Sequence, residues 1–142
     1  MDTTLESGAP ATATRHATRV LVIEDDPAMR ELLTEELERD GYEVMSVPNV
    51  AGARLELLIA SHVGLERMPA VVVTDRRMPD GDGMDLLAEM RRHWWWLPAV
   101  VVTAFADNES RRRARALGRC HVLAKPVDLD LVRLAVRECL ET

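Results

Sequence analysis

The sequence predicts an α/β protein in which five parallel strands form one doubly wound sheet, in the order 2-1-3-4-5, with helices on both faces. Short apolar runs rich in β-branched residues, such as 71–73 and 99–102, alternate with segments of helical periodicity. Several of these runs stop at a charged or polar side chain and then turn. Right-handed crossovers leave few topologies, and this order places strands one and three side by side.

The strands are expected at 19–26, 42–47, 71–75, 99–103 and 121–124. The run 71–73 is continuously apolar, as in a strand buried on both faces, and it ends at Asp75. The second strand alternates polar and apolar residues, which suits an edge position. Lys125-Pro126 ends the fifth strand.

Two helices are expected in the first half of the domain. The first begins with Asp26 as cap and Pro27 as first residue, and ends at Gly41. Its expected buried face consists of Met29, Leu32, Leu33 and Leu37. Asn49 is the candidate cap of the second helix, which carries Val50, Leu55, Leu58 and Ile59. A loop is expected at 61–69.

Three more helices follow. Asp82 and Asp85 resemble a capping box before a helix with Met84, Leu87 and Met90 facing inward. A short helix is expected at 107–117, ended by Gly118. Asp128 caps the last helix, with an inward face that includes Leu131, Val132, Ala135 and Cys139.

Size and composition limit the classes of function. The 142 residues predict one domain at 19–142 after a flexible tail at 1–18 that lacks apolar periodicity. A net charge of −6 argues against direct nucleic-acid binding. We expect a cytoplasmic protein, since the chain shows no membrane-length apolar run and no secretory signal. Cys120, Cys139 and the four histidines have no metal-ligand spacing.

Chemically useful side chains follow four of the strands: Glu24 and Asp25, then Asp75, Thr103 and Lys125. The carboxyl ends of parallel strands share one edge, where ligands of such sheets bind, so these side chains can converge. Three neighbouring carboxylates would repel one another, and a hard cation such as Mg²⁺ (or Mn²⁺) would relieve the repulsion. A nucleophilic carboxylate, a metal, a lysine and a hydroxyl together suit the binding and transfer of a phosphoryl group. No GxxxxGK[ST] loop is present, so a nucleotide is not the expected donor.

Four segments in order, 24–26, 74–83, 102–104 and 124–126, resemble the response-regulator receiver domain of two-component signalling, a flavodoxin-like fold. The resemblance covers residue 19 to the C-terminus. It implies that Asp75 accepts a phosphoryl group from a phosphohistidine of a sensor histidine kinase or a histidine phosphotransfer protein. It also implies Mg²⁺ ligation by Asp25, Asp75 and the backbone carbonyl of Arg77, with Glu24 acting through water. Thr103 and Lys125 would contact the bound phosphoryl group and shift the fourth helix and fifth strand.

The sequence departs from the family pattern at several positions. Val122 replaces the usual Phe or Tyr three residues before the lysine, which puts aromatic-gated switching in doubt. Gly118-Arg119 replaces the usual Gly-Ala. Arg77 and Phe105 occupy the two positions that tune phosphoryl lifetime, and a bulky Phe105 could hinder the attacking water.

The main expectation is a phosphorylation-dependent switch that catalyses its own aspartyl phosphorylation and dephosphorylation without being an enzyme of the usual kind. The alternatives are a phosphorylation-independent interaction module and a Mg²⁺-dependent phosphohydrolase. Such hydrolases typically carry a second Asp where this chain has Arg77. A downstream target protein or a further effector domain would respond to the switch. The chain would then be a free-standing regulator, a phosphorelay intermediate or a fragment of a longer regulator. A homodimer is a further expectation.

Two runs remain outside this scheme. Trp94-Trp95-Trp96 is expected at the edge opposite the acidic residues, with one or two rings closing the core and at least one exposed. Arg111-Arg112-Arg113 with Arg115 forms either a solvated helix face or a docking patch for an acidic partner.

Overall fold

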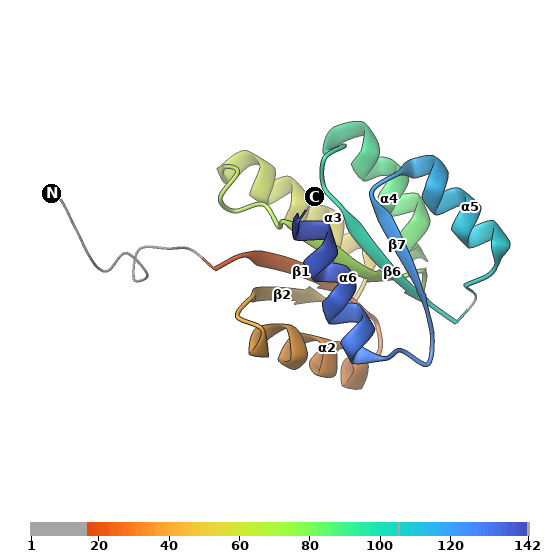
Figure 1. The fold of residues 1–142 in the computed structure, drawn as a ribbon. Coiled ribbons are helices and arrows are strands. Elements are labelled where there is room, and N and C mark those ends of the chain that lie inside the picture. The colour runs from red at the N-terminus through yellow and green to blue at the C-terminus, as the bar shows by residue number, and fades with distance from the viewer. Residues whose placement is uncertain (1–16, 105, 142) are drawn as a thin grey trace, which may run out of the picture.

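Five parallel strands form one sheet with helices on both faces in the computed structural model, which describes residues 17–104 and 106–141 (Figure 1). The strands are β1 (Arg19–Ile23), β2 (Glu43–Val47), β3 (Val71–Asp75), β6 (Ala99–Thr103) and β7 (Cys120–Ala124). Their order, β2-β1-β3-β6-β7, confirms the predicted 2-1-3-4-5 arrangement and the edge position of the second strand. Residues 1–16 of the expected tail lie outside the described residues, so the tail stays a prediction.

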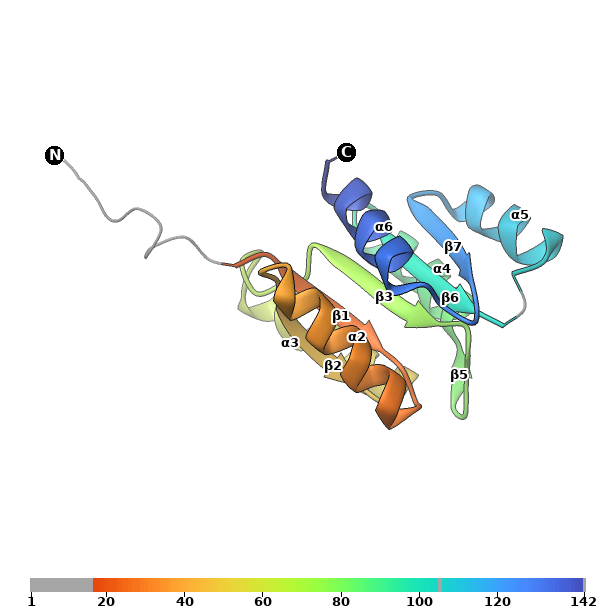
Figure 2. The same ribbon diagram turned by 60° about the horizontal axis from the view of Figure 1, so that its bottom comes forward.

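A small antiparallel hairpin follows the central strand. It consists of β4 (Arg77–Met78) and β5 (Gly81–Asp82), with Pro79 and Asp80 in its turn. Figure 2 shows this hairpin projecting beyond the end of β3. The two carboxylate oxygens of Asp80 accept hydrogen bonds from the backbone nitrogens of Val50 and Ala51, each at 3.0 Å. These hydrogen bonds join the hairpin to the first turn of the helix α3 (Val50–Val63).

The five helices divide between the two faces of the sheet: α2 (Pro27–Arg39), α3 (Val50–Val63), α4 (Gly83–His93), α5 (Asn108–Leu117) and α6 (Leu129–Glu141). Alternate side chains of β3 point to opposite faces. Val71 and Val73 belong to the core cluster under α2 and α6, and Val72 belongs to the cluster under α3, α4 and α5. The continuously apolar β3 is buried on both sides, as expected.

Side-chain caps fix the helix starts where the sequence placed them. Asp26, Asn49 and Asp82 each accept a hydrogen bond from a backbone nitrogen in the first turn of α2, α3 and α4. Asp128 does the same at α6, accepting from the nitrogen of Asp130 at 2.9 Å. The expected capping-box partner Asp85 instead accepts a hydrogen bond from Arg113 on α5.

Several predicted boundaries and faces were wrong. Helix α3 continues through 61–63, which were expected in a loop, and ends at Gly64, whose φ of 146° breaks the helix. Leu32 is 47% exposed and Leu131 is 49% exposed, although both were assigned to buried faces. Each lies one residue before the stripe that reaches the sheet, so the helix turns it outward. Strand β1 ends at Ile23, which leaves Glu24, Asp25 and Asp26 in the turn after it.

The amino ends of the strands carry the tryptophan run as expected. Trp94 and Trp96 are half-buried against the core under α3 and α4, whereas Trp95 is 66% exposed. Within residues 17–104 and 106–141, no helix is both long and apolar enough to cross a membrane.

Candidate functional site

Strand register brings the predicted site residues to one edge of the sheet. Ile23 pairs with Thr74, so Glu24 and Asp75 follow directly on neighbouring strands. Thr103 pairs with Ala124, and the Lys125 backbone nitrogen donates to the Thr103 carbonyl at 2.9 Å. The turns after β1, β3 and β7 and the end of β6 therefore meet at the carboxyl edge. A crevice at this edge is the usual ligand position in a doubly wound sheet.

Three carboxylates form the acidic part of the site. Glu24, Asp25 and Asp75 each place one carboxylate oxygen within 4.8 Å of the others. Glu24 is buried and Asp75 is 9% exposed, while Asp25 is open to solvent. Burial raises the pKa of Glu24, and the charge of Asp75 raises it further, against the opposing effects of a hydrogen bond from the Asp26 nitrogen and the charge of Lys125. The mutual repulsion of these carboxylates is of the kind that a bound cation relieves.

Lys125 supplies the positive charge at this edge. Its Nζ donates to Asp75 Oδ2 at 2.8 Å and lies 3.6 Å from Glu24 Oε1. Burial alone would lower the pKa of Lys125, but the hydrogen bond to Asp75 and the two carboxylate charges outweigh it and raise that pKa. Lys125 is therefore an ammonium group at neutral pH and holds the Asp75 side chain at the mouth of the site.

A small pocket opens beside these groups. Its volume is about 110 Å³, and it is lined by Asp75, Arg77, Thr103, Ala104 and Lys125. Thr103 is 1% exposed at the end of β6. The pocket contacts a carboxylate, an ammonium and a hydroxyl-bearing residue at once. It has the size and donor set for a single phosphoryl group.

Gly83 permits the close approach of α4 to the end of β3. Its nitrogen donates to the Arg76 carbonyl at 2.6 Å, and a Cβ at this position would lie 2.3 Å from the Asp75 carbonyl oxygen. Any side chain here would push α4 away from the strand that carries Asp75. In the sequence, Gly83 stands out only as the last residue of the segment 74–83.

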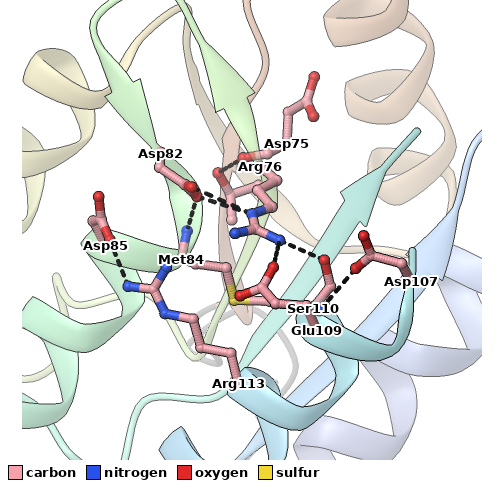
Figure 3. Close-up of polar contacts among 10 residues, drawn as sticks. Asp75, Arg76, Asp82, Met84, Asp85, Asp107, Glu109, Ser110 and Arg113 are labelled. Atoms are coloured by element: carbon pink, nitrogen blue, oxygen red, sulfur yellow. Dashed lines mark hydrogen bonds and ion pairs between the residues drawn. The ribbon is translucent and has the colours of Figure 1, made fainter. Parts of the chain in front are cut away.

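Arg76 is a site neighbour that the sequence did not single out. Its side chain is 8% exposed and contacts Asp82 of β5 and Glu109 and Ser110 of α5 (Figure 3). The signal was available in the alternation of β3, since Arg76 shares the parity of Val72 and Thr74 and thus points toward the core under α4 and α5. A charged residue at such a position requires buried polar partners.

Other candidate groups lie apart from this edge. Burial raises the pKa of Cys120 to about 12 and that of Cys139 to about 11, so both thiols are protonated at neutral pH. Val122 is half-buried against the core under α3, α4 and α5. Arg111, Arg112 and Arg115 are exposed on α5. Phe105, proposed to tune phosphoryl lifetime, lies outside the described residues.

Comparisons with known proteins agree with this geometry. The family model for the response regulator receiver domain matches residues 20–137. An uncharacterised 14.6 kDa protein of Leptolyngbya boryana, from the sodA1 3′ region, is 40% identical over 125 residues, covering 85% of this chain and 89% of that protein. The regulatory protein AtoC of Escherichia coli strain K12 is 32% identical over 123 residues, covering 87% of this chain but only 25% of AtoC.

The structural comparison leads to the same group. The response regulator TrrA of Thermotoga maritima, solved in complex with Mg²⁺ and BeF, superposes with a TM-score of 0.71 at 27% identity, covering 87% of this chain and 99% of that one. The family match includes the five strands, apart from Arg19 at the start of β1, and the residues at their carboxyl ends. The chain therefore belongs to the response regulator receiver domain family.

Proposed function

We propose that the protein is a phosphorylation-dependent switch whose acceptor is Asp75. The observation that carries this proposal is the Asp75 carboxylate itself, paired with Lys125 at 2.8 Å and lining a pocket with Thr103. A nearly buried carboxylate at the end of a central strand is seldom needed for packing. Its partners are those that phosphoryl transfer needs.

In the transfer step, an Asp75 oxygen attacks the phosphorus of a donor phosphohistidine. The P–N bond breaks, the imidazole nitrogen leaves with the bonding electrons and takes up a proton, and Asp75 becomes an acyl phosphate. The Lys125 ammonium then pairs with the new phosphoryl oxygens instead of the Asp75 carboxylate, and Thr103 donates a hydrogen bond to one of them. Hydrolysis reverses the state, as water attacks phosphorus and the carboxylate leaves with release of inorganic phosphate.

The residues present fit a divalent cation. Three carboxylates face one lysine, which leaves two uncompensated negative charges when all four groups are ionised. Mg²⁺ or Mn²⁺ would balance them, held by Asp25, Asp75 and the Arg77 carbonyl, with Glu24 acting through water. When bound, the ion neutralises the charge that develops on the transferring phosphoryl oxygens.

The partners follow from the transfer step. A sensor histidine kinase or a histidine phosphotransfer protein supplies the phosphoryl group, and a downstream protein or an effector domain responds to it. The chain spans 89% of the Leptolyngbya protein but about a quarter of AtoC, so relatives use this domain alone or within longer chains. A homodimer and a cytoplasmic location stay predictions.

Intact mass tests the proposal. Wild type and Asp75→Asn are incubated with acetyl phosphate, with and without Mg²⁺. We expect wild type to gain the mass of one phosphoryl group only with Mg²⁺, and Asp75→Asn to gain none because an amide cannot form the acyl phosphate. Absence of both an adduct and Mg²⁺ binding in the wild type would refute the switch and favour the phosphorylation-independent interaction module. That alternative is also favoured by Val122, which stands where the family usually has an aromatic residue.

A further inference from the structure

The guanidinium of Arg76 joins the acceptor strand to helix α5. One terminal nitrogen donates to Glu109 Oε1 at 2.9 Å and also to the hydroxyl of Ser110. The Nε atom faces both oxygens of Asp82, at 3.4 and 3.3 Å. Figure 3 shows this group between the cap of α4 and the first turn of α5. The side chain of Arg76, the residue next to Asp75, therefore connects the end of β3 with the starts of α4 and α5.

The guanidinium of Arg76 stays charged in this environment. Burial would lower the pKa of Arg76, but the hydrogen bond with Glu109 and the charge of Asp82 outweigh it and raise that pKa. Ser110 is 0% exposed, and the Arg76 side chain is 8% exposed. Charge-assisted contacts of this kind are strong and directional, and removing one partner leaves a buried group unsatisfied.

Helix α5 buries few side chains, and its other contacts lie along β7 and at its last turn, where Arg91 Nε donates to the Leu117 carbonyl at 3.1 Å. Its sequence is strongly polar, and Ser110 and Ala114 are the residues that it buries fully. A second ion pair joins Arg113 to Asp85 on α4, but the Asp85 side chain is 70% exposed, so water screens this pair. In the first turn of α5, the contacts of Arg76 with Glu109 and the buried Ser110 reach another element, whereas the Asp107 cap lies within the same segment.

The same first turn is connected to the pocket from the other side. Thr103 lines the pocket with Ala104, and only residues 104–107 separate Thr103 from the start of α5. Asp75 belongs to β3, which is paired with β1 and β6, and Lys125 follows β7, which is paired with β6. Loosening α5 should therefore move Ala104, which lines the pocket between the end of β6 and the start of α5, more than it moves the acidic side.

We propose that Arg76 is a positioning residue that clamps the first turn of α5 to the end of β3 and thereby fixes the Ala104 wall of the phosphoryl pocket. The wall excludes water from the acyl phosphate, so the clamp sets the lifetime of the phosphoryl group. This inference rests on the proposed function for its lifetime readout, but the clamp itself has a separate test.

The test compares Arg76→Met, which keeps the apolar stem, with Arg76→Lys, Glu109→Gln and the control Arg113→Met. Hydrogen exchange in the unphosphorylated proteins reports the clamp directly. We expect exchange in the first turn of α5 to become about threefold faster or more in Arg76→Met, less so in Glu109→Gln, and to be close to wild type in Arg113→Met. Arg76→Lys keeps the charge and should recover part of the effect. Glu109→Gln alters an exposed carboxylate and serves if Arg76→Met does not fold.

The second readout separates positioning from general destabilisation. After labelling with acetyl phosphate and removal of the donor, we expect the adduct of Arg76→Met to decay about threefold faster or more, with a labelling rate within about twofold of wild type. A merely destabilised protein would lose labelling as well. Wild-type exchange and decay in folded Arg76→Met and Glu109→Gln would overturn the clamp, as would loss of labelling in folded Arg76→Met. If no protein is labelled, the proposed function fails, and hydrogen exchange still decides on the clamp.

Discussion

Replacement of Gly83 by alanine tests how closely α4 must approach the acceptor strand. The added Cβ would lie 2.3 Å from the Asp75 carbonyl oxygen and 3.1 Å from Thr74 Oγ1. Carbon–oxygen contacts rarely fall below about 3.3 Å, so the backbone of α4 must move by about 1 Å. The carbonyl cannot give way easily, because β3 is paired on both sides and Thr74 Oγ1 donates to that oxygen at 2.8 Å.

The expected cost follows from two contributions. Forcing a methyl group into a packed region costs about 1–3 kcal/mol. The movement also strains the hydrogen bond from the Gly83 nitrogen to the Arg76 carbonyl, worth about 1 kcal/mol. We therefore expect Gly83→Ala to lower the free energy of unfolding by about 2–4 kcal/mol.

Gly81 provides the matched control two residues earlier. A Cβ there would lie 3.3 Å from a methyl group of Val50, a side-chain contact that can adjust. We expect Gly81→Ala to stay within about 0.5 kcal/mol of wild type. Urea unfolding followed by tryptophan fluorescence measures both variants, and acetyl phosphate labelling shows whether the shift of α4 slows phosphorylation. Equal midpoints for the two variants would show that the close approach of α4 is not required.

Two further predictions concern charge. Lys125→Met removes the ammonium that lies 2.8 Å from Asp75 and 3.6 Å from Glu24. We therefore expect tighter Mg²⁺ binding, measured by calorimetry, together with slower labelling by acetyl phosphate. Weaker Mg²⁺ binding would contradict the assigned electrostatics. The Arg133 hydrogen bonds, at 2.9 and 2.8 Å, lower the pKa of Asp40 below its ordinary value of 3.8. The stabilisation by this pair is therefore present above that pH and lost as the pH falls through the lower folded pKa. The loss in urea midpoint caused by Arg133→Met should accordingly be larger at about pH 6 than near pH 3, and an equal loss at both would reject the linkage.

The sequence by itself determined the sheet and the content of the candidate site. Apolar β-branched runs define the strands, and the polar residues that end them, from Glu24 to Lys125, must gather because parallel strands place their carboxyl ends at one edge. Caps such as Asn49 and Asp82 were readable because a cap acts within a few residues of itself. These features depend on local spacing and on topology alone.

Only the tertiary structure decided which helical residues face the core and which partners the buried charges find. Leu32 and Leu131 are apolar but lie beside the stripes that contact the sheet. A shift of one residue around a helix is enough to turn a side chain from the buried to the exposed face. Arg76 is bound by Glu109 and Ser110, more than thirty residues away, through the approach of α5 to the end of β3. Contacts between residues so distant in sequence depend on how two elements pack, which neither propensity nor periodicity encodes.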